Sequence, residues 1–257
     1  MDTLEKLFFL NKILLDEMPQ YKEQANQFKK NKTEQSRLFR CLVNVRPAVK
    51  SSEEFIEVQD EYLIEVAKEK GIVKLEDLTE VKPNIYLWQG DITRLSVDGI
   101  VNAANNALLG CFIPCHSCID NAIHTFSGVQ LRVECNKIMQ NQGHNEETGK
   151  AKITKAYNLP SKYVIHTVGP IINGKLTEKD CQLLESCYRE CLNLAIDNHL
   201  KSIAFCCIST GEFRFPNDKA SEIAVKTVSE IIKERDIKVV FNVFKEQDRE
   251  LYRRLLC

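Results

Sequence analysis

The sequence of 257 residues predicts a layered α/β domain that is preceded by a helical N-terminal extension. Two observations predict this arrangement. Residues 81–257 alternate short apolar runs with amphipathic segments, the pattern of strands and helices in an α/β sheet. Residues 1–80 contain a single glycine, Gly71, and apolar side chains that recur at helical spacing. We therefore place the boundary between the two parts at residue 80.

The extension is expected to contain about three helices, connected near residues 17–33 and 45–51. Ser51-Ser52-Glu53-Glu54 supplies an N-cap followed by acidic first-turn residues, and apolar residues recur at helical spacing from Phe55 onward. Gly71 is placed to end that helix. Nothing in this part carries chemistry, so we interpret it as an appendage that packs against the following domain or caps it.

The α/β part contains short apolar runs, several of them rich in β-branched residues, as buried strands are. The expected strands are Ile85–Gln89, Gly99–Ala103, Tyr163–Thr167, Ser202–Ile208 and Val239–Val243. The expected helices are residues 119–141, 177–198, 218–234 and 246–256. In a sheet of this kind the ligand site lies at the carboxyl ends of the strands.

Composition excludes several classes of protein. Lys and Arg number 35 and Asp and Glu 36, a balance that argues against a nucleic-acid-binding protein. The longest apolar candidate for a membrane span, Phe8–Leu15, is interrupted by Asn11 and Lys12 and is far shorter than the ~20 residues that a bilayer requires. The N-terminus carries no export signal, so we expect a cytoplasmic protein. The 11 cysteines are odd in number, which argues against a disulfide framework.

Three polar segments follow expected strands and therefore belong at the ligand edge of the sheet. Asp91 after Gly90 could present a carboxylate to a ligand, or form an Asx turn. The asparagines of residues 102–106 suit the hydroxyls of a sugar, although a turn satisfied by its own side chains has the same pattern. Residues 209–216, with one glycine, could point successive N–H groups at a phosphate or form an ordinary loop.

A fourth segment, residues 110–120, holds three cysteines and one histidine in a single loop. Thiolate and imidazole are the ligands that Zn²⁺ selects. Cys115 and His116 are adjacent, so their side chains should diverge and only one should bind. Cys118 is expected at a helix N-terminus, where the helix dipole lowers a thiol pKa. We therefore expect Cys111, His116 and Cys118 to hold one zinc with an open fourth position; the alternative is a loop of buried thiols with one surface histidine.

Taken together, these segments resemble the macrodomain family, which binds ADP-ribose. The resemblance runs from about Ile85 to the C-terminus and rests on five motifs in the family's order. These are Gly90-Asp91-Ile92-Thr93, Asp98-Gly99-Ile100-Val101-Asn102-Ala103-Ala104-Asn105, Asp120-Asn121-Ala122-Ile123-His124, Val164-Ile165-His166-Thr167-Val168-Gly169-Pro170 and Ser209-Thr210-Gly211. The resemblance implies a three-layer α/β/α fold with a mixed central sheet.

Two departures narrow the resemblance. Residues 111–118 stand where ordinary macrodomains carry a glycine-rich loop, which is similar to the zinc-containing branch of the family. Members of that branch are bacterial and fungal, carry a helical N-terminal extension and remove ADP-ribose from proteins; residues 1–80 fit that description. The second departure is Glu212-Phe213-Arg214, where other members are richer in glycine, which leaves open how the diphosphate is held.

The resemblance also assigns roles by position. Asp91 would accept a hydrogen bond from the adenine amino group, assisted by the backbone N–H of Ile92. Asn105 would hold the distal ribose, Asp120 would lie beside that ribose and the diphosphate, and zinc would lie next to the scissile C1″ bond. His124 is expected to be a satisfied structural histidine, with a supporting role behind Asp120 as the alternative. The other expected ADP-ribose contacts are Cys118, Ile119, Ser209, Thr210, Gly211, Glu212 and Phe213.

The resemblance implies a glycosidase-type hydrolase that removes ADP-ribose from mono-ADP-ribosylated proteins, most simply from the ester of an acidic residue. Its expected catalytic residues are Asp120, Cys118 and His116, because zinc lowers the pKa of bound water to ~7 and Asp120 could position that water or act as a base. The alternatives are an ADP-ribose reader with a structural zinc and an O-acetyl-ADP-ribose deacetylase. The expected partners are ADP-ribose, an ADP-ribosylated protein and a sirtuin-type ADP-ribosyltransferase system, with no nucleic acid and no membrane.

Overall fold

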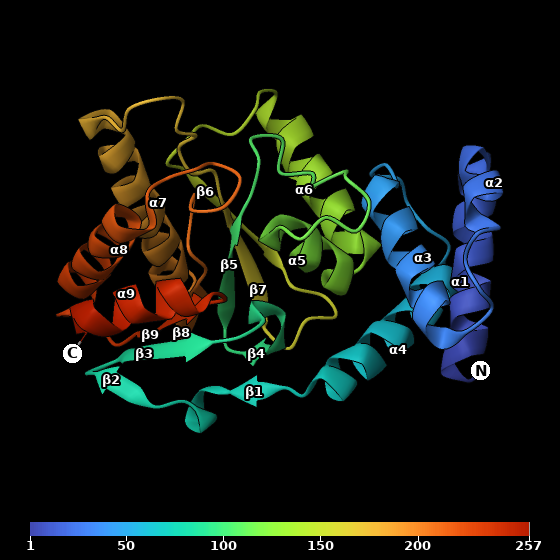
Figure 1. Cartoon of the computed structure of the whole chain (residues 1–257), viewed down its shortest axis with the longest axis horizontal. Helices are drawn as coiled ribbons and strands as arrows, with labels where there is room; N and C mark the ends of the chain where they lie inside the picture. Colours follow the sequence, from blue (N-terminus) through green and yellow to red (C-terminus); the bar gives the residue numbers. More distant parts are fainter. Residues whose placement is uncertain (257) are drawn as a thin grey trace.

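The computed structural model describes residues 1–256 and shows a helical part beside a sheet that helices cover (Figure 1). The chain begins in the helical part, drawn in blue, and its last helix lies on the other side of the sheet, drawn in red. Each part has its own apolar core. Across residues 1–256, every helix is too short or too polar to cross a bilayer.

The helices of the N-terminal part begin and end at conventional caps. Asp2 and Glu5 form a capping box at the start of the first helix. The Ser52 hydroxyl accepts the backbone N–H of Phe55, and Gly71, at φ 80°, ends the same helix, as the sequence predicts. The helices are α1 (Thr3–Glu17), α2 (Lys22–Ala25), α3 (Lys32–Val45) and α4 (Glu53–Lys70), with a 3₁₀ turn, η1 (Pro19–Tyr21).

A seven-stranded sheet in the order β2-β3-β9-β8-β5-β7-β6 forms the centre of the second part. The two edge strands run antiparallel to their neighbours and the inner strands are parallel, so the sheet is mixed. Its strands are β2 (Glu80–Lys82), β3 (Ile85–Gln89), β5 (Gly99–Ala103), β6 (Ala151–Lys155), β7 (Tyr163–Thr167), β8 (Ser202–Phe205) and β9 (Lys238–Val243). Two short strands, β1 (Val73–Lys74) and β4 (Leu95–Ser96), pair separately, and two 3₁₀ turns, η2 (Leu75–Asp77) and η3 (Ile92–Arg94), lie near them.

Helices cover both faces of the sheet, which confirms the three-layer α/β/α fold (Figure 1). Two of them lie between the sheet and the N-terminal part, where α3 and α4 pack against the first. The other three cover the opposite face. Their bounds are α5 (Ile119–Ser127), α6 (Val129–Gln142), α7 (Glu178–Asp197), α8 (Asn217–Ile232) and α9 (Glu246–Leu256).

Three expected elements differ from the structure. The single helix expected over residues 119–141 is two helices, because Gly128 takes φ 95° between them. The strand expected to reach Ile208 ends at Phe205, so the residues after it already belong to the loop at the sheet edge. Helix α8, expected over residues 218–234, spans Asn217–Ile232 and directly follows Pro216. Edge strands β2 and β6 are not predicted by the sequence, because they are short and half-exposed.

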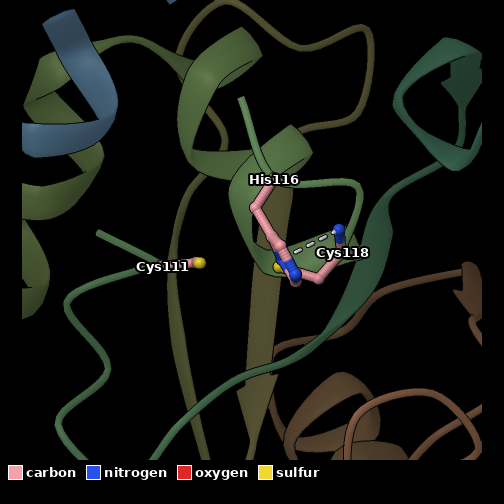
Figure 2. Close-up of side chains that lie close together, drawn as sticks. All are labelled: Cys111, His116 and Cys118. Carbon is pink, nitrogen blue, oxygen red and sulfur yellow. Dashed lines mark hydrogen bonds between the residues drawn. The ribbon is translucent and has the colours of Figure 1, made fainter. Parts of the chain in front are cut away.

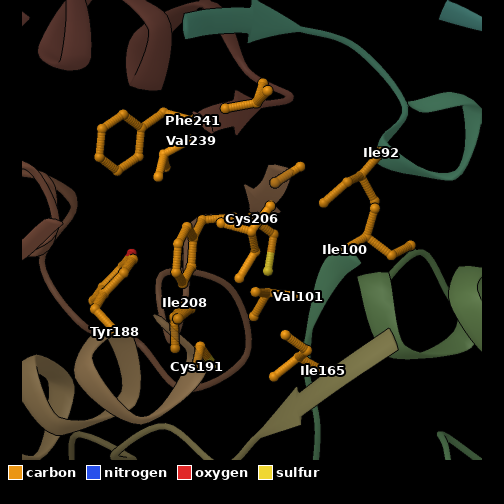
Figure 3. Packing of buried hydrophobic residues seen from close by; sticks show 14 of the residues in the cluster. Ile92, Ile100, Val101, Ile165, Tyr188, Cys191, Cys206, Ile208, Val239 and Phe241 are labelled. Atoms are coloured by element: carbon orange, nitrogen blue, oxygen red, sulfur yellow. The ribbon is translucent and has the colours of Figure 1, made fainter. Parts of the chain in front are cut away.

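The core around the sheet accounts for several of the cysteines (Figure 3). Cys187 and Cys191 of α7 are fully buried, and Cys206, just after β8, lies among apolar side chains of the sheet. All ten cysteines within residues 1–256 are free thiols. Burial as small apolar groups is therefore a sufficient reason for these three.

Candidate functional site

The polar segments singled out in the sequence lie at one edge of the sheet. Strands β3, β5 and β8 belong to the parallel set, so their carboxyl ends point to the same edge. Hydrogen bonds tie the segments that follow them. The backbone N–H of Ile172, after β7, donates to the carbonyl of Phe213, after β8, at 2.9 Å. Across the edge, His116 Nε2 lies 3.6 Å from Glu212 Oε1.

Asp91 is held from two sides. Its side chain caps η3, with Oδ1 accepting the backbone N–H of Thr93 at 3.0 Å and the Thr93 hydroxyl at 2.6 Å. Its Oδ2 accepts Lys70 Nζ, from the end of α4, at 2.6 Å. Burial raises the pKa of Asp91, but the hydrogen bonds from Lys70 and Thr93 outweigh burial and lower it overall. The carboxylate is therefore ionised and fixed, and the next residue, Ile92, is buried.

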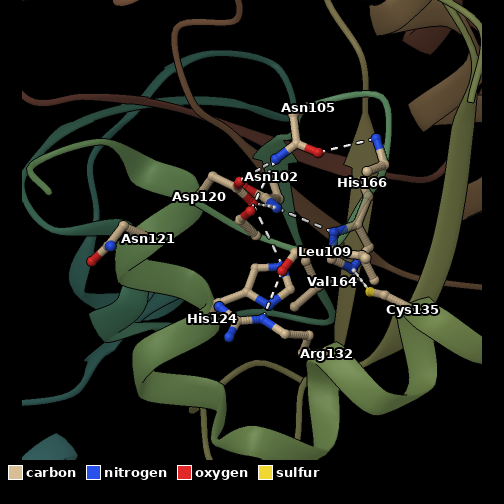
Figure 4. Close-up of polar contacts among 12 residues, drawn as sticks. Asn102, Asn105, Leu109, Asp120, Asn121, His124, Arg132, Cys135, Val164 and His166 are labelled. Atoms are coloured by element: carbon tan, nitrogen blue, oxygen red, sulfur yellow. Dashed lines mark hydrogen bonds and ion pairs between the residues drawn. The ribbon is translucent and has the colours of Figure 1, made fainter. Parts of the chain in front are cut away.

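A buried amide network surrounds Asp120 (Figure 4). Asn102 Nδ2 donates to Asp120 Oδ1 at 2.8 Å, and Asn105 Nδ2 donates to Oδ2 at 3.3 Å. Asn105 also holds its own loop, because Nδ2 donates to the Gly110 carbonyl and Oδ1 accepts the Ala107 N–H, each at 3.0 Å. Burial raises the pKa of Asp120 to about 6, although the Asn102 hydrogen bond opposes this shift.

Cys111, His116 and Cys118 converge in the loop before α5 (Figure 2). One donor atom from each lies within 4.8 Å of the other two, and all three residues are half-buried. Cys118 is the N-cap of α5, where its Sγ accepts the N–H of Asn121 at 3.4 Å. The Cys118 N–H in turn faces His116 Nδ1 at 3.4 Å. Ile119, also expected at the ligand, is the first residue of α5.

The lowered thiol pKa expected for Cys118 is wrong. Cys118 does stand at a helix N-terminus, but burial and the neighbouring Cys111 and Asp120 raise its thiol pKa to about 12. A cation at this place would reverse the balance, because a metal-bound thiol is deprotonated. Two thiols and an imidazole that face one point, half shielded from water, are a donor set that fits zinc.

Cys115 faces away from these three donors. Its Sγ lies 2.6 Å from Cys41 Sγ on α3, and its backbone N–H donates to Asn44 Oδ1 at 2.9 Å. Arg40 of the same helix donates through Nη2 to the His116 carbonyl and to Asn121 Oδ1, each at 2.9 Å. The N-terminal part therefore holds the loop that carries the metal-type donors.

Sequence reasoning missed three residues that surround the site, all from the helical part: Arg40, Asn44 and Lys70. They are ordinary polar residues on amphipathic helices, and no local motif marks them. Only the docking of α3 and α4 against α5 places them at the sheet edge. The helical part is thus more than the packing appendage that its composition indicates.

The structural role expected for His124 is only partly right. The ring is buried, yet neither nitrogen has a hydrogen-bond partner within the described residues, and Nε2 lies 3.6 Å from Asp120 Oδ1. Burial lowers the pKa of His124, so the imidazole is neutral at pH 7. His166 and Cys135 lie close by (Figure 4), and burial lowers the pKa of His166 to about 3.

The loop after β8 has an irregular backbone. Ser209 and Arg214 take positive φ angles of 65° and 58°, and the N–H of Phe215 donates to the Ser209 carbonyl at 3.0 Å. The Thr210 hydroxyl donates to the Cys207 carbonyl at 3.0 Å. Within residues 1–256 the backbone N–H groups of residues 211–213 find no acceptor, so they are available to an anion.

The chain is similar in sequence to proteins of known family. The sequence pattern of the family described as Macro domain matches residues 101–224. The chain is 54% identical over 262 residues to a protein of Treponema medium named protein-ADP-ribose hydrolase, and the match covers all of both chains. It is 53% identical over 220 residues to a protein of the same name from Staphylococcus aureus strain MSSA476, covering 84% of this chain and 82% of that protein.

The chain is also similar to solved structures of macrodomains. A macrodomain of Oceanobacillus iheyensis, solved as a point mutant with ADPR, is 37% identical and superposes with a TM-score of 0.63 over 70% of this chain and 95% of that one. A Trypanosoma brucei macrodomain in complex with ADP-ribose is 31% identical, with a TM-score of 0.65 over 83% of this chain and 94% of that one.

Proposed function

Because this chain belongs to the macrodomain family, we propose that it is a hydrolase that removes ADP-ribose from ADP-ribosylated proteins. The relative named protein-ADP-ribose hydrolase matches over the full length of both chains, including the helical part. The observation that carries the proposal is the convergence of Cys111, His116 and Cys118 in the loop that leads to the buried Asp120. A module that only binds ADP-ribose needs neither group.

Zinc is the metal that we propose for this loop, held by Cys111, His116 and Cys118. When bound, zinc would supply Lewis-acid chemistry at this place. The loop residues contribute in their own right. Arg40 fixes the His116 carbonyl, and the Asn121 N–H holds Cys118 Sγ, so the donors are positioned before any ligand arrives.

Asp120 is the group that we propose to handle the proton. With a pKa of about 6 it is mostly ionised at pH 7, yet basic enough to accept a proton from an attacking water. Asn102 and Asn105 each donate to one of its oxygens and so fix the plane of the carboxylate. Asp120 can therefore orient the water molecule and then take its proton.

The rest of the edge is proposed to bind ADP-ribose. Asp91, ionised and fixed, would accept the adenine amino group. The free N–H groups of residues 211–213 would point at the diphosphate, since they find no acceptor among the described residues. The Oceanobacillus iheyensis and Trypanosoma brucei macrodomains were solved with ADPR and with ADP-ribose, which supports this ligand for the same fold. For the modified residue we propose the ester of an acidic side chain.

The test is release of ADP-ribose from a protein that carries it on glutamate or aspartate. The wild-type protein is compared with Cys118→Ala, His116→Ala and Asp120→Asn, with metal analysis of each preparation and with chelator treatment. Cys115→Ser is the matched control, because it lies in the same loop but faces Cys41. We expect turnover to fall at least about a hundredfold in the first three variants and to survive in the control.

The other outcomes are equally specific. Undiminished turnover in Cys118→Ala, in His116→Ala and after chelation would exclude a catalytic metal. Binding of the modified protein without release would indicate a reader. Release of acetate from O-acetyl-ADP-ribose, with no turnover of modified protein, would favour a small-molecule deacetylase that uses the same site.

A further inference from the structure

Lys70 closes the nucleoside end of the site from outside the α/β layers. It is the last residue of α4, and its side chain is 29% exposed. Its ammonium lies 2.6 Å from Asp91 Oδ2 and 3.2 Å from the Thr93 hydroxyl oxygen. It also lies 3.6 Å from the centre of the Phe126 ring on α5. The helical part thus supplies a cation that touches the carboxylate proposed to bind adenine.

These three contacts use all three protons of the ammonium. Asp91 and Thr93 each accept one of them, and the remaining side of the ammonium faces the ring, which is a favourable place for a cation. The Thr93 hydroxyl donates its own proton to Asp91 Oδ1. Lys70 therefore has no proton left for a ligand, and its effect on a base must pass through Asp91.

Anchoring of the helix end does not explain the arrangement. The end of α4 is already fixed by Arg94, whose Nε donates to the Gly71 carbonyl at 2.7 Å. An exposed lysine paired with a carboxylate is usually worth little. Here both side chains of the pair are half-buried, and the lysine also contacts a buried threonine and an aromatic ring. The arrangement fixes the direction of one carboxylate oxygen.

We propose that Lys70 is a positioning residue of the nucleobase subsite, which makes the helical part a contributor to the choice of an amino-bearing purine. This inference rests on the proposed function. Lys70 holds Oδ2 of Asp91 in place, and the free lone pair of that oxygen accepts the amino hydrogen of the base. A base with a carbonyl at the same position would set two acceptors against each other, so it is rejected. Without Lys70 the carboxylate can turn to water, and discrimination falls.

The experiment compares two ligands that differ only at this position of the base. ADP-ribose carries an amino group there, and inosine diphosphate ribose carries a carbonyl. Their dissociation constants are measured calorimetrically for the wild type, Lys70→Met and Lys70→Arg. Exposed Lys68, on the same turn of α4, provides the matched control Lys68→Met. Thermal unfolding of each variant shows whether it is folded, and Lys70→Gln replaces Lys70→Met if that variant is not.

We expect Lys70→Met to weaken ADP-ribose binding about tenfold and to leave inosine diphosphate ribose nearly unchanged, so that the ratio of the two constants shrinks. Lys70→Arg should restore most of the ratio, and Lys68→Met should match the wild type. With modified protein as substrate, KM should rise and kcat should stay constant.

Three results would overturn the inference. Equal losses for both ligands would assign Lys70 a purely structural role, and unchanged binding of both would assign it none. Failure of the wild type to bind either ligand would instead overturn the proposed function on which the inference rests.

Discussion

The sulfur atoms of Cys41 and Cys115 lie 2.6 Å apart, although the two residues are 74 positions apart in the chain. One belongs to α3 of the helical part and the other to the loop that carries Cys111, His116 and Cys118. Both thiols are half-buried rather than enclosed in a core. The pair is therefore the one place in the described structure where a covalent bond could join the helical part to the candidate site.

Mild oxidation is expected to convert this pair into a disulfide. The two thiols lose two electrons and two protons to hydrogen peroxide, which is reduced to water, and a sulfur–sulfur bond forms. Peptide mass spectrometry should find the linked peptides short of two hydrogen atoms, and a thiol reductant should restore them. Cys41→Ser should abolish the product and Cys181→Ser should not. Linked peptides that contain other cysteines, with none from this pair, would contradict the assignment.

Gly110 is expected to resist substitution more than Gly143, another glycine at positive φ. It takes φ 81°, and a Cβ there would lie 2.8 Å from the His124 ring. Gly110→Ala should lower the free energy of unfolding by about 1–3 kcal/mol. Gly143 is the matched control, since it takes φ 77° with nothing within 4 Å of the added atom. Urea unfolding of both variants separates the cost of the backbone from that of the ring contact; equal losses would mean that the ring yields freely.

The protonation of Asp120 is expected to appear in the stability of the metal-free protein. Burial raises its pKa from 3.8 to about 6, so folding favours the protonated form. That contribution is complete below pH 3.8 and is lost as pH rises to about 6. Asp120→Asn cannot ionise, so its free energy of unfolding relative to the wild type should increase through this window and then level off. Urea unfolding after chelation measures the difference, and a flat difference would place the pKa near its ordinary value.

The extent to which the sequence predicts this molecule follows from how local each signal is. Strands Ile85–Gln89 and Gly99–Ala103 are predicted to the residue, because a buried parallel strand is a continuous apolar run. Strand β6 is not predicted, because at the sheet edge its residues are only half-buried and the sequence Ala-Lys-Ile-Thr-Lys resembles a polar loop. The break at Gly128 depends on a single backbone angle.

In the candidate site, too, residues that are close together in the sequence are predicted and residues brought in by the packing of distant helices are not. Cys111, His116 and Cys118 lie within eight residues, so their convergence is visible in the sequence alone. Lys70 and Arg40 reach Asp91 and His116 from far along the chain, through the packing of helices whose own sequences show only amphipathic character. The sequence also predicts the wrong direction for the pKa of Cys118. The helix N-terminus that would lower this pKa is visible locally, whereas the burial that raises it is a property of the whole fold.

Arg40 provides the last prediction, on retention of the proposed zinc. Its guanidinium donates to the His116 carbonyl and to the Asn121 side chain, which itself donates to the Ile113 carbonyl at 3.0 Å. Loss of such outer contacts typically weakens a metal site ten- to a hundredfold. Arg40→Met should therefore lose zinc to a chelator at lower concentration than the wild type, and added zinc should restore its turnover. Arg37→Met is the control, because its exposed side chain on the same helix packs over the Phe28 ring. Equal retention of zinc by Arg40→Met and the wild type would show that the loop holds its donors without the helical part.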